Sequence, residues 1–177
     1  GEPMRTGDAE ADHIIPLCVG GTKLQIICRE CHILKTASEL AAMIRAKQVG
    51  CVELLEHFLK RCDAHNKALN AIVVFRRDEA LARARAADEA LAKGESWGPL
   101  HGVPMTIKES YDWEGTPTTW GVPDLKDNVA KTNSVVVDRM LSAGVILFGK
   151  TNVPLLLSDW ETFNEIYGTT NNPWDLG

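Results

Sequence analysis

The stretch "GPLHGVPMTIKES" (residues 98–110) sets the fold class of this chain. Its Gly and Pro residues favour a turn, and the segment after them is typical of a β-strand. Val103, Met105 and Ile107 alternate along it and would lie on one face of a sheet. The apolar stretch ends at Lys108, so we expect burial to desolvate the amine of this lysine.

Helical and strand-like segments alternate on both sides of this strand. "AIVVF" (71–75) predicts a buried strand, and the Ala-rich segment 77–94 predicts a helix with Gly94 just past its end. Residues 133–144 predict a helix that ends at a glycine, followed by the strand "VILFGK" (145–150). This order of elements predicts an α/β fold.

Composition excludes several classes of protein. The chain has 177 residues, 45% of them hydrophobic, and a net charge of −5, which argues against a large surface for nucleic acid. No apolar run approaches the roughly 20 residues that cross a bilayer, and the polar, acidic start does not resemble a signal peptide. Five cysteines do not form a pattern typical of a secreted disulfide framework. We therefore expect a cytoplasmic location without a membrane partner.

Three motifs together resemble the N-terminal portion of the amidase signature family. They are "GPLHGVPMTIKES", "SAGVILFGKTNVP" (142–154) and "YGTTNNPWDLG" (167–177), and the resemblance covers residues 37–177. It implies a mixed sheet covered by helices and a hydrolase that cleaves the carbon–nitrogen bond of carboxylic amides with a Ser–Ser–Lys triad. It also implies a small-molecule amide substrate, no cofactor, and Lys108 as the general base.

The chemistry of such a triad explains what else the site requires. A serine hydroxyl attacks a carbonyl only when a nearby base removes its proton, and a lysine acts as that base only when it is neutral. In the family, both serines lie in a Gly/Ser-rich segment, and this sequence ends at Gly177, just short of the expected place. We expect Ser110 to be a hydrogen-bonding neighbour of Lys108 and not a nucleophile, so the chain alone is expected to be inactive.

The first residues resemble a different family. "ADHIIPL" (11–17), a Gly pair and "LQIICRECHILKT" (24–36) are similar to the core of HNH endonucleases, which fold as a ββα unit. The resemblance implies His13 as general base on a water, with Mg²⁺ or Zn²⁺ as the divalent metal and DNA as the partner. Its implied metal ligands are Asp12, His32, Cys28 and Cys31. Only half of a Cys-based zinc site is present, and Lys23 replaces the family's middle asparagine.

The sequence thus predicts two parts: a partial HNH-like Cys/His module over 1–36 and the N-terminal part of an amidase domain over 37–177. We see no way for the two parts to share one active site, since a nuclease needs a metal and a phosphate groove and an amidase needs a dry lysine and a serine. Three hypotheses remain open at this point: a truncated amidase, an HNH-type DNA-binding or DNA-cleaving protein, and a fusion or truncation product without function. Whether the chain is an enzyme stays open with them.

Overall fold

The computed structural model describes residues 10–13, 24–27 and 29–173, and it describes side chains from Thr36 onward. The helices and strands in chain order are β1 (Glu10–His13), β2 (Leu24–Ile27), α1 (Arg29–Arg45), α2 (Cys51–Leu69), β3 (Ile72–Phe75), α3 (Arg77–Ala92), β4 (Pro104–Lys108), α4 (Val135–Ser142), β5 (Ile146–Thr151), β6 (Phe163–Asn164) and β7 (Gly168–Thr169). The α/β order predicted from the sequence is confirmed.

A mixed three-stranded sheet of order β3-β5-β4 forms the centre of the fold. β5 lies in the middle, antiparallel to β3 and parallel to β4. Its residues Ile146 to Lys150 are all buried, as expected of a strand that is covered on both faces. β4 has no strand on its outer side among the residues that the structure describes.

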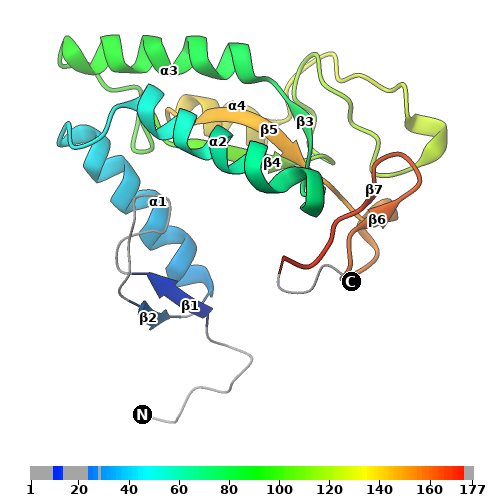
Figure 1. The fold of residues 1–177 in the computed structure, drawn as a ribbon. Coiled ribbons are helices and arrows are strands. Elements are labelled where there is room, and N and C mark those ends of the chain that lie inside the picture. The colour runs from blue at the N-terminus through cyan, green and yellow to red at the C-terminus, as the bar shows by residue number, and fades with distance from the viewer. Residues whose placement is uncertain (1–9, 14–23, 28, 174–177) are drawn as a thin grey trace.

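Helices cover both faces of this sheet (Figure 1). The end of α1 packs with α2 and α3 in one core, to which β5 contributes Ile146 and Phe148. α4 packs on the opposite face, where its Val137 lies in a second core with Leu147 of β5. Alternate residues of β5 therefore serve the two cores, as the period of a strand requires.

Alanine lines the buried face of α3. Ala80, Ala84 and Ala87 lie three and four residues apart, so they share one side of the helix, and each is at most 2% exposed. Small side chains on this face let α3 pack closely against α2 and the sheet. The helix ends as the sequence predicts, because Gly94 follows the cap residue with a φ of +81°.

The predicted boundary between residues 36 and 37 falls inside a helix. α1 runs without interruption from Arg29 to Arg45, so one continuous helix joins the two predicted parts. No Gly or Pro interrupts this segment, which is consistent with one continuous helix. The chain leaves the helix only at residues 46–50. In front of α1, β1 and β2 pair antiparallel, with His13 opposite Leu24. The Cys/His metal module of this region stays a prediction, because its side chains lie outside those described.

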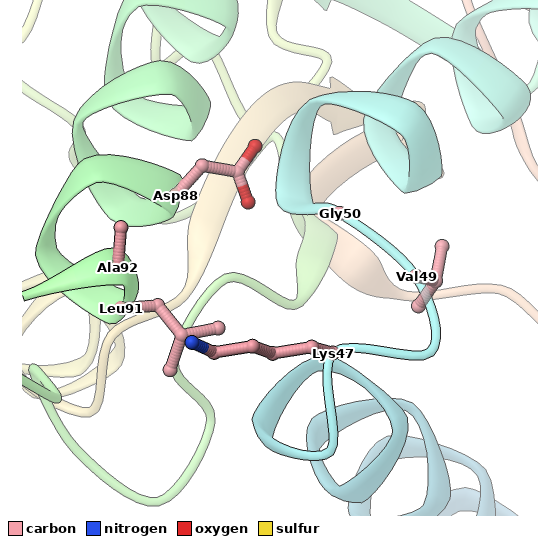
Figure 2. A pocket seen from close by; sticks show the side chains of 6 residues that line it. All are labelled: Lys47, Val49, Gly50, Asp88, Leu91 and Ala92. Atoms are coloured by element: carbon pink, nitrogen blue, oxygen red, sulfur yellow. The ribbon is translucent and has the colours of Figure 1, made fainter. Parts of the chain in front are cut away.

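Asp88 of α3 caps the N-terminus of α2 (Figure 2). Its two carboxylate oxygens accept hydrogen bonds from the backbone N–H groups of Cys51 and Val52, at 2.7 and 3.1 Å. Figure 2 shows Asp88 on α3 facing the Gly50 end of α2, and Lys47 extended toward Leu91. These residues line a cavity of about 200 Å³. This contact between two helices was not predicted from the sequence.

We expect Asp88→Ala to lower the free energy of unfolding by about 1–2 kcal/mol, because two N–H groups at a helix start lose their acceptor. Urea denaturation followed by circular dichroism measures the change. Glu89→Ala is the matched control, since Glu89 is the next residue of the same helix and is exposed. An equal loss in the two variants would contradict the capping role.

Among the described residues, none of the helices combines the length and apolar character needed to cross a bilayer.

Candidate active site

Lys108 is the last residue of β4, where it pairs in register with Thr151 of β5. Its side chain is exposed among the described residues, so the burial expected from the apolar sequence before it is wrong for this part of the chain. The reason is its place in the sheet: β4 is an outer strand with no strand beside it among the described residues, and the side chain of its last residue, Lys108, lies open to solvent.

Ser110 is not part of the strand that ends at Lys108. β4 ends at Lys108, and the chain turns at once, with the Tyr111 N–H donating to the Lys108 carbonyl at 3.1 Å. Ser110 lies in this turn and is half-buried. The expectation of a hydrogen bond between the two side chains has no support in the structure.

Glu109, the residue after Lys108, is completely buried. One carboxylate oxygen accepts from the Thr119 N–H at 2.7 Å and from the Tyr167 hydroxyl at 3.0 Å, and the other accepts from the Trp120 N–H at 3.1 Å. Its own N–H donates to the Thr151 carbonyl at 2.9 Å. A buried carboxylate is costly without such partners, so Glu109 joins three segments of chain at the end of β4.

Lys150 near the end of β5 is the buried lysine of this region, with 0% of its side chain exposed. Its ammonium donates to the hydroxyls of Thr116 and Thr118, at 3.3 and 3.0 Å, and to the carbonyl of Pro117. Burial lowers the pKa of Lys150 to about 8, while the nearby negative charge of Glu109 opposes this shift. The sequence did not predict this role of Lys150.

Two asparagines attach the segment after β5 to the same region. Asn164 donates from Nδ2 to Oδ1 of Asn152 at 2.9 Å and to the Val153 carbonyl at 2.8 Å. Asn152 donates from its own Nδ2 to the Gly168 carbonyl at 3.0 Å. These bonds hold β6 and β7 beside the carboxyl end of β5, on the side from which Tyr167 reaches Glu109.

Comparison with known proteins places this arrangement in a family. A model of the family described as Amidase matches residues 53–177. The chain is 42% identical over 142 residues to an acylamidase of Rhodococcus erythropolis, covering 80% of this chain and 30% of the relative. It is 46% identical over 140 residues to an indoleacetamide hydrolase of Bradyrhizobium diazoefficiens, covering 79% and 27%.

The chain belongs to the amidase signature family. Solved structures agree: a bacterial aryl acylamidase of that family superposes with a TM-score of 0.73 at 31% identity, covering 79% of this chain and 29% of the other. A fatty acid amide hydrolase superposes with a TM-score of 0.74 at 28% identity, covering 79% and 25%. This amidase chain thus spans less than a third of the length of these relatives.

The buried ammonium in the amidase fold gives stability a pH dependence of known sign. The usual pKa of lysine, 10.5, applies to the unfolded chain, and the folded value for Lys150 is about 8. Between these values the unfolded chain holds a proton that the folded chain has released. The free energy of unfolding therefore rises with pH in this window, by up to about 1.4 kcal/mol per pH unit.

We expect this rise to vanish in Lys150→Met. Denaturation in urea from pH 7.5 to 10 measures the free energy of unfolding of both proteins, and the rise is read from the value for the unmodified chain minus that for the variant. The difference matters because burial raises the pKa of Cys51 to about 12, which lowers stability above pH 9 in both proteins. Lys126→Met, at an exposed lysine, is the control and should keep the rise. A flat difference for Lys150→Met would contradict the lowered pKa.

His101, in the turn before β4, has a structural role. It is fully buried, accepts from the Trp97 N–H at its Nδ1 at 3.1 Å, and has the Ala87 carbonyl 3.1 Å from its Nε2. A carbonyl accepts only, so Nε2 holds the proton and the ring is satisfied as the neutral form. These partners fix the loop before β4 to α3.

The structure does not test whether the residues of the HNH hypothesis form a site. Asp12 and His13 lie on β1, and Cys31 and His32 lie on α1, but their side chains are outside those described. Cys28 lies outside the described residues. Among the side chains that the structure does describe, no group of three or more His, Cys, Asp or Glu could hold a metal ion. The metal-ligand set stays a prediction.

A groove of about 800 Å³ on the described surface lies away from Lys108. Its walls include Phe58 and Leu69 of α2 and Met105 in the first half of β4. Lys108 at the other end of β4 is not part of its lining. The described residues therefore hold the candidate base on an open edge and not inside a formed substrate pocket.

Proposed function

We propose that this chain contributes the lysine base of an amide hydrolase that acts on the carbon–nitrogen bond of small carboxylic amides. The observation that supports the proposal most is the position of Lys108 within the amidase match, at the carboxyl end of a strand paired with the "GKTN" strand. The relatives named above, an acylamidase and an indoleacetamide hydrolase, act on amides by their names. The proposed reaction needs no cofactor.

In the proposed mechanism, Lys108 in its neutral form takes a proton through a bridging serine from a nucleophilic serine. The nucleophile attacks the amide carbonyl, and the proton passes on to the leaving amine. Among the serines of the described residues, none lies in a Gly-flanked turn that could supply the nucleophile and the N–H groups of an oxyanion hole. We therefore propose that both serines belong to amidase sequence that these 177 residues do not contain, and that this sequence also covers and desolvates Lys108.

Two assays of ammonia release from simple amides test the proposal. The 177-residue chain alone should give no turnover. A chimera, in which residues 37–177 replace the matched part of the R. erythropolis acylamidase, should hydrolyse amides with saturation kinetics. Turnover by the chain alone would place the nucleophile within it, and a folded but inactive chimera would contradict the contribution of an amidase base.

A second candidate is a metal-dependent nuclease of the HNH type, with His13 as general base and Asp12 and His32 as metal ligands. The observation that favours it is the pairing of β1 with β2 immediately before α1, in the order of a ββα unit. Plasmid nicking that requires Mg²⁺ or Zn²⁺ and is lost in His13→Ala would support it. No nicking by the folded chain would reject it, and silence in both assays would favour a product without function.

A further inference from the structure

Two buried side chains of opposite charge hold one loop from different strands. The loop 116–120 gives Lys150 three acceptors, namely the two hydroxyls of Thr116 and Thr118 and the carbonyl of Pro117. The last two residues of the same loop give Glu109 two donors, the N–H groups of Thr119 and Trp120. Lys150 comes from β5, and Glu109 follows β4, so the loop is fixed to both parallel strands at once.

The three hydrogen bonds of Lys150 exclude it as a catalytic base. An ammonium has three protons, and each has a protein oxygen as its acceptor in this structure. The side chain is also fully buried, so no substrate reaches its amine. Lys150 therefore acts on the loop and not on a reacting atom.

Lys108 lies between the two attachment points. In the register of the parallel pair, Lys150 is opposite Ile107, and Thr151 is opposite Lys108. The N–H of Glu109 continues this ladder to the Thr151 carbonyl at 2.9 Å. Any change in the position of Glu109 or of β5 at Lys150 thus moves the backbone from which Lys108 extends.

We propose that Glu109 and Lys150 are positioning residues that clamp the loop 116–120 onto the ends of β4 and β5 and so fix the backbone of Lys108. The proposal rests on the proposed function for the role of Lys108, but the clamp itself is a property of this chain. The charged and titratable groups that act on the clamp are Glu109 and Asp112, whose charges raise the pKa of Lys150, and Tyr167, whose hydroxyl donates to Glu109.

Amide hydrogen exchange of the whole 177-residue chain tests the clamp without any substrate. In the unmodified chain, the N–H groups of Thr119 and Trp120 should be protected as strongly as those of β5. In Glu109→Gln and in Lys150→Met, their exchange, and that of the Glu109 N–H beside Lys108, should rise about tenfold to a hundredfold. Exchange at Ala84 and Ala87 in α3 should stay within about twofold, which separates release of the loop from global unfolding.

The double variant tests whether the two residues act together. Because either change releases the same loop, exchange in Glu109→Gln/Lys150→Met should match that of the more affected single variant and not the product of both effects. Titration of Lys150, followed by NMR of its side-chain ¹³Cε, gives a second readout. Its midpoint should move to lower pH in Glu109→Gln, because a negative charge that favours the ammonium is gone.

Several results would overturn the clamp. One is an exchange rate of the Thr119 and Trp120 amides in the unmodified chain that equals that of an open loop. This result would overturn the clamp even if no variant folds. An unchanged Lys150 midpoint in Glu109→Gln, or multiplied effects in the double variant, would show that the residues act independently. A released loop with an unchanged Glu109 N–H would show that the loop does not position Lys108. An inactive chimera would reject the proposed function and leave these outcomes as they are.

Discussion

Lys108→Ala is expected to lower kcat of the amidase chimera by about 10³-fold, with little change in KM. The reason is the loss of the base that activates the nucleophile, since general base catalysis contributes typically about 10²- to 10⁴-fold. Amide binding should persist, because in the proposed mechanism Lys108 acts on the nucleophile, and it does not line the groove of about 800 Å³. Initial rates of ammonia release over a range of amide concentrations separate the two constants.

Two control variants make this test specific. Lys108→Arg keeps the positive charge but cannot lose its proton, so it should be as inactive as the alanine variant. Lys126→Ala removes an exposed lysine elsewhere on the surface and should leave the rate unchanged. Full activity in Lys108→Arg would mean that position 108 serves as a charge and not as a base, and the proposed mechanism would then be wrong.

Gly144→Ala is expected to lower the free energy of unfolding by about 3 kcal/mol or more. Gly144 lies between α4 and β5 with a φ of +93°, a conformation that costs other residues about 1–2 kcal/mol. A Cβ atom there would also lie 2.7 Å from the Cα of His101, which is backbone and cannot move aside cheaply. Equilibrium unfolding in urea measures the loss.

Gly94→Ala separates the two causes of this loss. Gly94 follows α3 with a φ of +81°, but nothing lies within 4 Å of the Cβ that alanine would add. It should therefore lose only the conformational cost, about 1 kcal/mol. If both variants lose the same amount, the close approach of Gly144 to His101 does not contribute to stability.

Much of the fold could be predicted because its signals are local. Alternation at Val103, Met105 and Ile107 indicated β4, and glycines 94 and 144 indicated the ends of two helices, both of which the structure confirms. The amidase resemblance over the second part of the chain is confirmed for residues 53–177. The motifs could predict the fold class because each one indicates a turn or a strand by its own residues.

The arrangement around the candidate base could not be predicted, because it depends on contacts distant in sequence. Lys150 is buried by residues 32 to 34 positions away, and Glu109 meets Tyr167 across 58 positions. The sequence showed both residues only as charges beside apolar strands. The exposure of Lys108 has the same origin, since the strand pattern reports which face is apolar but not which element covers the strand's end.

The position of β5 has a consequence for how the chain folds during synthesis. It is the central strand, yet it is made last of the three, about 75 residues after the β3 residues with which it pairs and about 40 after those of β4. Until the ribosome has released Thr151, α2 and α3 can pack on each other but have no central strand to cover. The slow event in acquiring this structure should then be the arrival of one strand, after which both layers of helices can close around it.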